Sequence, residues 1–155
     1  MKLTQITPNN IDQLDIVMDM IYEEWGSTFS SSKESKLQKL KEGILQNGKF
    51  PQIYLLQEGE ENVAAFSILE HELKGSDLSP WLACVVVNKK FRGKGYGKTL
   101  LQQIKNTIED NFEQIYLTTE LIGFYEKIGF QLMSIIGNNG KNNRLYCKTT
   151  NKKET

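Results

Sequence analysis

Cysteine is scarce in this chain of 155 residues, and no charge of either sign is in excess. The only two cysteines, Cys84 and Cys147, each stand alone in strand-like runs, so they form neither a metal-binding spacing nor a disulfide framework. The 19 basic residues balance the 19 acidic ones, so no overall field favours nucleic acid or an anionic membrane. Residues 1–15 hold no long apolar run, and we expect no signal peptide and no membrane anchor. We therefore expect a cytoplasmic protein without a metal site.

The length and the apolar pattern predict one α+β domain with a mixed sheet, residues 1–148, followed by a polar tail, residues 149–155. After a short first strand, apolar residues at helical spacing predict two helices between residues 11 and 45. Two β-type runs then read as a hairpin, and Trp81–Val87 is apolar at every position, which is typical of a central strand covered on both faces. A helix, a strand, a short helix and a final pair of strands follow.

Three glycines and three cations crowd the stretch that follows the predicted central strand, Phe91–Leu100 (FRGKGYGKTL). A nucleotide-binding P-loop needs a glycine five positions before its last one, and Arg92 stands there instead. A dinucleotide-binding fingerprint needs a glycine at its sixth position, which Lys98 occupies. The stretch therefore fits neither nucleotide motif well, and a P-loop-like nucleotide-binding protein is kept only as the last alternative.

The same stretch has the physical features of an anion site. Its glycines allow φ > 0, and the helix that starts there leaves its first backbone N–H groups without intrahelical partners. The positive end of the helix dipole points the same way, and Arg92, Lys94 and Lys98 add charge around it. Together these features predict a cradle for a pyrophosphate. The alternative is a solvated glycine-rich connection without a ligand.

Two segments of the chain resemble signatures of the GNAT family of N-acetyltransferases. Val87–Gly97 (VNKKFRGKGYG) resembles the family's acetyl-CoA motif, which runs Val, four spacers, then Arg/Gln-x-x-Gly-x-Gly/Ala. Phe124–Phe130 (FYEKIGF) is similar to the second signature, a short helix carrying tyrosine before Gly-Phe. The sequence PWLA at residues 80–83 is similar to a bacterial subset. Two motifs in the right order are more specific than either one alone.

The resemblance, strong from about Ile53 to Phe130, implies both a fold and an activity. The implied fold has three layers, α/β/α, around a mixed, mostly antiparallel sheet of about seven strands with about four helices. The implied activity is transfer of an acetyl group from acetyl-CoA, as co-substrate, to a primary amine of a small molecule or peptide. A module that binds acyl-CoA without turnover is the alternative. Neither nucleic acid nor a membrane is an expected partner, and a homodimer is left open.

The resemblance also implies the residues that hold and activate acetyl-CoA. Tyr125 would be the general acid that protonates the departing thiolate, although an aromatic residue that only packs is the alternative. A backbone amide of the central strand would polarise the thioester carbonyl. Many family members carry an asparagine where this chain has Thr118, so that side-chain hydrogen bond is not expected here. The implied acetyl-CoA-binding residues are Val85, Val86, Val87, Arg92, Gly93, Lys94, Gly95, Tyr96, Gly97 and Lys98.

The sequence indicates the acceptor side less sharply. Glu70 is a candidate base that would take the proton of the amine, and it belongs to an acidic cluster beside the expected acceptor cleft. His71 has a suitable pKa, but strand alternation would place it on the opposite face from Glu70. The acidic cluster favours a cationic acceptor. The candidate acceptor-binding residues are Glu24, Trp25, Glu72 and Asp77, with a solvated helix end as the alternative for Glu24 and core packing for Trp25.

Overall fold

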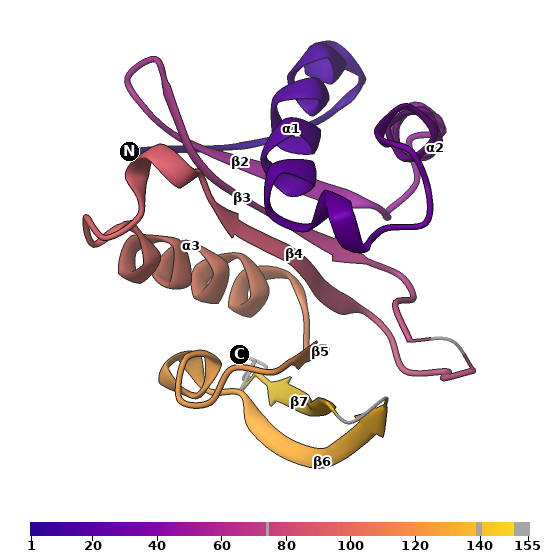
Figure 1. Cartoon of the computed structure of the whole chain (residues 1–155), viewed down its shortest axis with the longest axis vertical. Helices are drawn as coiled ribbons and strands as arrows, with labels where there is room; N and C mark the ends of the chain where they lie inside the picture. Colours follow the sequence, from indigo (N-terminus) through magenta and orange to yellow (C-terminus); the bar gives the residue numbers. More distant parts are fainter. Residues whose placement is uncertain (74, 139–140, 151–155) are drawn as a thin grey trace.

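A computed structural model describes residues 1–73, 75–138 and 141–150 of the chain. Its seven strands form one sheet in the order β1-β2-β3-β4-β5-β7-β6, and only β4 and β5 run parallel. Helices α1 and α2 cover one face of the sheet and α3 lies against the other (Figure 1). The expected three-layer fold with a mostly antiparallel sheet is therefore confirmed. The strands are β1 (Lys2–Gln5), β2 (Gln52–Glu58), β3 (Glu61–Leu69), β4 (Trp81–Val87), β5 (Gln114–Thr119), β6 (Gln131–Asn138) and β7 (Lys141–Thr149).

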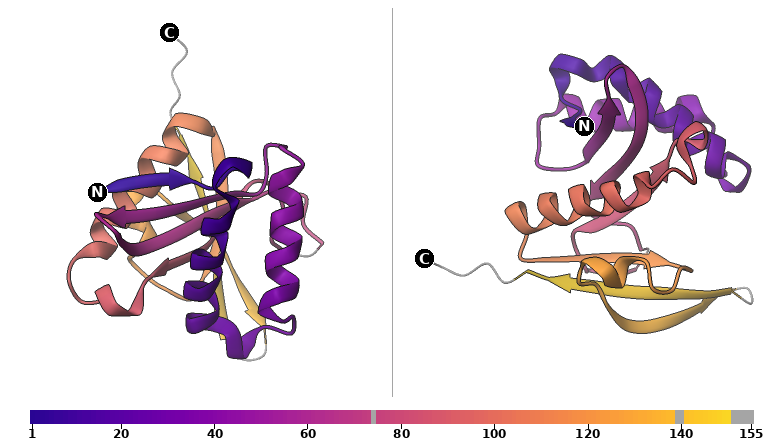
Figure 2. Two further views of the ribbon diagram at one scale, coloured as in Figure 1. Left: turned by 90° about the horizontal axis from the view of Figure 1, so that it is seen from above. Right: turned by 90° about the vertical axis from the view of Figure 1, so that its left-hand side faces the viewer.

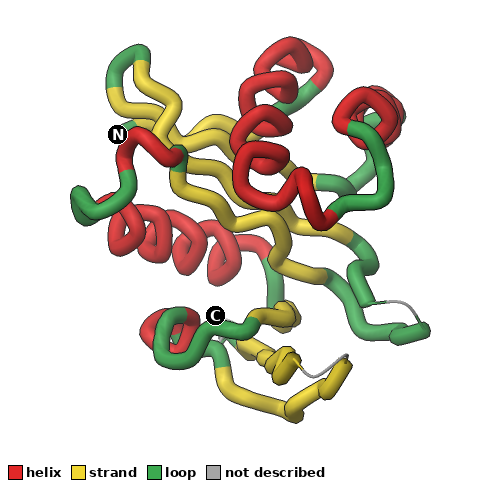
Figure 3. Tube along the Cα trace, viewed as in Figure 1, coloured by secondary structure: helices red, strands yellow, loops and turns green. Residues whose placement is uncertain are grey.

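The described residues form three α-helices, which are α1 (Leu14–Trp25), α2 (Lys33–Leu45) and α3 (Tyr96–Asn111). The fourth helix that the sequence predicts is a single 3-10 turn, η4 (Tyr125–Ile128), which ends at Gly129 in the left-handed conformation (Figure 3). Further 3-10 turns are η1 (Pro8–Gln13), η2 (Gly26–Thr28) and η3 (Lys89–Phe91). A run of four residues is too short for an α-helix, because its end groups outnumber its internal hydrogen bonds.

Each face of the sheet has its own apolar core. On one face α1 presents buried residues at helical spacing, such as Leu14, Met18 and Ile21, to β2, β3 and β4. On the other face α3 does the same with Leu100 and Ile104, which are almost fully buried. Because the central strands are covered on both sides, they are apolar at almost every position, as the sequence pattern predicts.

The sheet opens between β4 and β5. These two strands share a single residue pair, Trp81 with Tyr116, and then diverge. On its other side β4 carries a β-bulge against β3, where Cys84 adopts a φ of 54°. The Ser67 hydroxyl donates a 2.8 Å hydrogen bond to the carbonyl oxygen of Ala83 beside the bulge. A bulge turns a strand and disrupts its ladder, so β4 bends at Cys84, beyond Trp81 where it pairs with β5.

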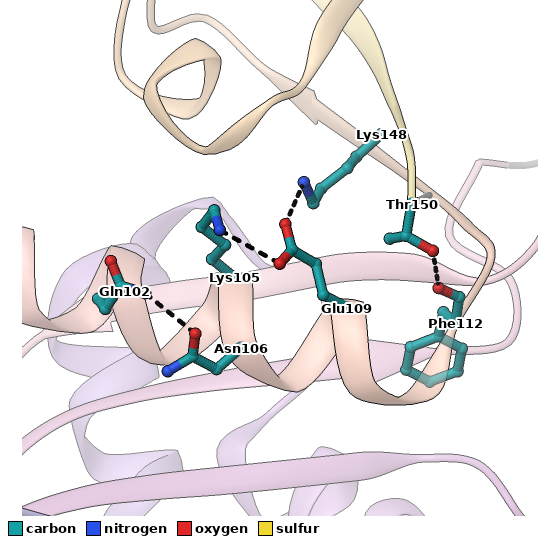
Figure 4. Close-up of polar contacts among 7 residues, drawn as sticks. All are labelled: Gln102, Lys105, Asn106, Glu109, Phe112, Lys148 and Thr150. Carbon is teal, nitrogen blue, oxygen red and sulfur yellow. Dashed lines mark hydrogen bonds and ion pairs between the residues drawn. The ribbon is translucent and has the colours of Figure 1, made fainter. Parts of the chain in front are cut away.

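Polar contacts tie α3 to the last strand (Figure 4). The buried ammonium of Lys148 in β7 lies 3.0 Å from a carboxylate oxygen of Glu109 in α3. The backbone N–H of Thr150 donates to the carbonyl oxygen of Glu113, at 2.8 Å, just beyond the end of α3. Figure 2 shows α3 lying between strands β2–β3 and the C-terminal strands. β7 and the contact of Thr150 thus extend two residues beyond the domain boundary expected at residue 148. The other residues of the predicted tail, 151–155, lie outside the described residues.

Candidate active site

Two clefts meet where the sheet opens. The loop cleft, of about 380 Å3, is bounded by residues 85–87 of β4, residues 91–93 and 97 of the glycine loop, and Phe124. The strand cleft, of about 520 Å3, is bounded by residues 82–85 of β4 and residues 117–121 at the end of β5. Five residues line both clefts and so mark their junction: Glu24, Trp25, Val85, Leu121 and Tyr125.

The glycine loop follows β4 and runs into α3, as the sequence predicts. Gly93 and Gly95 have φ values of 77° and 88°, in the left-handed region that favours glycine, and Gly95 is the N-cap of α3. A Cβ atom added at Gly93, Gly95 or Gly97 would meet no atom within 4 Å. Glycine is therefore required at the first two positions by backbone conformation, and the space around the loop is open to a ligand.

Two of the residues predicted to bind acetyl-CoA have side chains that are held by other parts of the protein. The Nε of Arg92 donates to the carbonyl oxygen of Val87, at 3.1 Å, and its Nη2 pairs with the carboxylate of Glu24 at 2.5 Å. The Tyr96 hydroxyl donates to a carboxylate oxygen of Glu58, at 2.7 Å, so this ring turns towards β2.

The two predicted lysines of the loop are exposed. Lys94 lies with its Nζ 5.7 Å from the centre of the Phe91 ring, while Lys98 is in the first turn of α3. Both side chains lie beside the helix N-terminus, where a positive charge favours an anionic ligand.

Tyr125 lies at the junction of the two clefts and is 6% exposed. Phe124 and Phe130 pack against its ring in edge-to-face geometry, with ring centres 4.9 and 6.0 Å away, which fixes the ring orientation. Burial raises the pKa of Tyr125 well above the ordinary value of 10.0. The phenol therefore keeps its proton at neutral pH and is able to donate a hydrogen bond to a ligand at the junction.

The three predicted valines of β4 have different surroundings. Val85 lies at the junction of the clefts, directly after the bulge. Val86 is buried, with its side chain in the core under α1 and α2, and Val87 borders the loop cleft. Of the three, Val85 is the one whose backbone is next to both clefts.

The predicted acceptor residues separate into two groups. Glu24 and Trp25, at the end of α1, line both clefts. Glu70, Glu72 and Asp77 are exposed and are not among the described residues that line either cleft. Because β3 ends at Leu69, strand alternation does not govern the residues that follow it. Partial desolvation raises the pKa of Glu72, and the nearby charge of Lys36 opposes that rise.

The strand cleft contains the predicted Glu24 together with residues that the sequence did not indicate. Among its described lining residues are two carboxylates, Glu24 and Glu120, and no lysine, arginine or histidine. Asn143 of β7 contributes an amide, and Cys84 contributes the side chain at the bulge. Asn143 is far from the motifs in sequence, so only the sheet order β4-β5-β7 brings it to this cleft. Glu120, one residue beyond β5, could have been found from the predicted end of that strand.

The described residues bring together no group of three or more side chains suited to a metal ion. None of the helices in the described ranges has both the length and the apolar character needed to cross a bilayer.

Comparison with known proteins identifies similar sequences and folds. Residues 50–132 match a family model described as an acetyltransferase (GNAT) domain. No curated protein matches the sequence. The matched segment contains β4, the glycine loop, α3, β5 and η4, so it contains most of both clefts.

Three solved structures illustrate the likeness in fold. An aminoglycoside 6'-N-acetyltransferase complexed with coenzyme A is 15% identical, with a TM-score of 0.73 over 100% of both chains. YncA from Salmonella typhimurium with its cofactor acetyl-CoA is 12% identical, with a TM-score of 0.68 over 99% of this chain and 96% of that one. A spermidine N-acetyltransferase SpeG chimera from Vibrio cholerae and hSSAT is 13% identical, with a TM-score of 0.69 over 96% of both. At these identities the likeness shows the fold.

Proposed function

Because the chain belongs to the GNAT acetyltransferase family, we propose that it transfers an acetyl group from acetyl-CoA to a primary amine of a small molecule or peptide. The observation that carries this proposal is the junction of two clefts at Val85 and Tyr125. One cleft leads to the glycine loop and suits the donor, and the other contains carboxylates and suits an amine. Acyl transfer requires two substrates to meet at one carbonyl carbon, and the junction offers such a place.

Acetyl-CoA would occupy the loop cleft. Its pyrophosphate would bind the backbone N–H groups between Gly93 and Lys98, at the N-terminus of α3, with Lys94 and Lys98 nearby. Its pantetheine arm would run along Val85–Val87 and bond to the strand backbone, as an added strand does. The divergence of β5 from β4 leaves room for that arm. Two structures of the same fold contain bound coenzyme A or acetyl-CoA, which supports acetyl-CoA as the donor.

The reaction would proceed by direct attack. The neutral amine nitrogen attacks the thioester carbonyl carbon, and the backbone N–H of Val85 stabilises the oxyanion, an effect of about 3 kcal/mol in comparable sites. The carbon–sulfur bond then breaks, and Tyr125 donates its hydroxyl proton or a hydrogen bond to the thiolate. The proton that the amine nitrogen loses ends on the coenzyme A thiol, either directly or by replacing the proton that Tyr125 gave to the thiolate. The products are the N-acetyl amine and free coenzyme A.

The strand cleft favours a cationic amine as acceptor. Glu24 and Glu120 both line it, and a carboxylate attracts an ammonium group before it loses its proton. Glu120 is the better candidate for the proton acceptor, because Glu24 is paired with Arg92. Glu70 remains the candidate base predicted from the sequence, but it is not among the described residues that line this cleft. Structures of the same fold include proteins named for acetylation of aminoglycosides and spermidine, which are cationic amines.

Release of the coenzyme A thiol from acetyl-CoA tests the proposal. The purified protein is incubated with acetyl-CoA and a panel of amines that includes an aminoglycoside, spermidine, free lysine and a peptide with a free N-terminus. We expect thiol release that depends on at least one amine. Binding of acetyl-CoA without amine-dependent release by any member of the panel would favour the binding-module alternative. A stronger response to ATP with magnesium than to acetyl-CoA would favour a nucleotide-binding protein.

A further inference from the structure

A third cavity lies on the opposite face of the sheet from the glycine loop. It has a volume of about 130 Å3 and lies between α1, α2 and the sheet. Its walls are mostly apolar and include Val17, Ile21, Leu40 and Phe66. An apolar cavity of about 150 Å3 in another protein stays dry and binds benzene, so this space has room for a chain of roughly three or four carbons.

Cys84 separates this cavity from the strand cleft. It lines both spaces, at the bulge of β4, and the next residue, Val85, lies at the junction where the acetyl group would sit. The Cys84 side chain packs with the core under α1 and α2. Burial raises the pKa of its thiol, so the side chain is a neutral wall and not a thiolate nucleophile.

The charges around the cavity indicate what it would accept. Lys36 and Lys39 of α2 contribute to its lining, and the Glu72 carboxylate, which acts on both Lys36 and Cys84, opposes their charge, so an ammonium-bearing acceptor finds no excess of negative charge there. The tail of an acyl donor carries no charge and is apolar. The cavity therefore suits an acyl chain better than it suits the amine substrate.

We propose that Cys84 sets the length of the acyl group that the protein accepts, by closing off the cavity behind it. With cysteine at this position the donor is limited to acetyl, and removal of the side chain joins the cavity to the strand cleft. A longer straight-chain acyl-CoA, such as butyryl-CoA, then places its tail among Val17, Ile21 and Leu40. This inference rests on the proposed function, because it requires an acyl-CoA with its thioester at the junction.

The test compares the affinities of acetyl-CoA and butyryl-CoA by isothermal titration, which needs no acceptor. Cys84→Gly removes the wall, and glycine suits the φ of 54°, so this variant is expected to fold. Cys84→Ala removes only the sulfur and should shift selectivity in the same direction by less. The filling variant Leu40→Trp, alone and combined with Cys84→Gly, blocks the cavity from α2. Circular dichroism and thermal melting check the fold of each variant.

Wild-type protein should bind acetyl-CoA more tightly than butyryl-CoA. Cys84→Gly should shift the ratio of the two affinities towards butyryl-CoA by about tenfold, which corresponds to about 1.4 kcal/mol. Adding Leu40→Trp should cancel that gain. An unchanged ratio in folded Cys84→Gly and Cys84→Ala proteins that still bind acetyl-CoA would overturn the role of Cys84 and leave the proposed function standing. If the shift towards butyryl-CoA persists when Leu40→Trp is added, the cavity is not its cause. If neither the wild type nor any variant binds either thioester, both proposals are overturned.

Discussion

Arg92 and Glu24 are 68 positions apart in the sequence, and their side chains form an ion pair that joins the glycine loop to the end of α1. Both residues line the loop cleft. The two side chains are 42% and 35% exposed, and exposed ion pairs contribute about 1 kcal/mol or less to folding stability. The ion pair therefore contributes more to the orientation of the two side chains than to the stability of the fold. A phosphate that enters the cleft would compete with Glu24 for the guanidinium group.

The first prediction concerns this competition. Glu24→Gln removes the carboxylate that holds Arg92, so acetyl-CoA should bind more tightly, by up to about fivefold for an exposed pair. Titration calorimetry at fixed salt measures the change. Glu23→Gln is the matched control, because Glu23 is exposed and is not among the residues described as lining either cleft, and it should change nothing. Weaker binding by Glu24→Gln would mean that the loop needs the tie to α1 in order to hold the donor.

The second prediction separates stability from binding at two neighbouring glycines. Gly97 is in the first turn of α3 with an ordinary φ, so Gly97→Ala should raise the free energy of unfolding by about 0.5 kcal/mol. The acetyl-CoA motif that this stretch resembles accepts alanine at this position, and a Cβ there meets no atom within 4 Å, so acetyl-CoA affinity should change little. Gly95→Ala must adopt a φ of 88° and should lose about 1 kcal/mol of stability as well as affinity. Thermal melts and titrations of both variants check these signs, and unchanged affinity in folded Gly95→Ala would count against the loop as the phosphate site.

The residues proposed to bind acetyl-CoA could be predicted from the sequence because they lie close together along the chain. The run from Val87 to Gly97 is continuous, and a buried strand followed by a glycine turn and a helix allows few geometries. Tyr125 was found in the same way, within one short signature. What the local pattern did not show is the partner of Arg92, because Glu24 reaches it only through the packing of α1 beside β4.

The residues that line the strand cleft could not all be predicted in this way, because they come from helices and strands that are far apart in the sequence. Asn143 reaches the strand cleft only because β7 pairs with β5, a fact that belongs to the sheet order. Glu70 and Glu72 were expected beside the cleft from their position after a strand, but β3 stops at Leu69 and the chain leaves the sheet there. The bulge at Cys84 has no signature of its own in the sequence, because a departure from the strand ladder has no fixed residue pattern.

A third prediction uses the contact between α3 and β7. Lys148 hydrogen-bonds Glu109 and lowers the pKa of that carboxyl below its ordinary value of 4.5, so the pair stabilises the fold above that value. The contribution is lost as the pH falls through the lower pKa of the folded state. Glu109→Gln leaves the buried Lys148 ammonium without its charged partner and should cost about 1 kcal/mol at pH 7, since Glu109 is partly exposed.

Thermal melts of wild type and Glu109→Gln between pH 7 and pH 3 measure this effect. The difference between the two should shrink as the pH falls below about 4.5, because the wild-type carboxyl is then protonated too. Asp110→Asn, on an exposed neighbouring residue of α3, is the control and should show a smaller difference. A difference between wild type and Glu109→Gln that stays constant with pH would show that the ion pair is not its source.

The fourth prediction concerns the chemical step. Tyr125→Phe keeps the ring that packs between Phe124 and Phe130, so acetyl-CoA affinity should change little while kcat falls about 100-fold. Because burial raises the pKa of Tyr125, activity should show no loss from tyrosine ionisation up to pH 10. Phe124→Leu is the control, and its effect should follow stability more than kcat. Full kcat in Tyr125→Phe would make the tyrosine a packing residue only.

Transfer of a labelled acetyl group tests the central claim most directly. The protein is incubated with acetyl-CoA that carries carbon-13 in its acetyl group, together with the amine that gives the fastest thiol release, and the products are identified by mass spectrometry and NMR. We predict an amide whose labelled carbonyl carbon is bonded to the nitrogen of the amine, formed in equal amount with free coenzyme A. Labelled acetate without any labelled amide, from protein that binds acetyl-CoA and releases its thiol, would contradict the claim that the two clefts form the active site of an N-acetyltransferase.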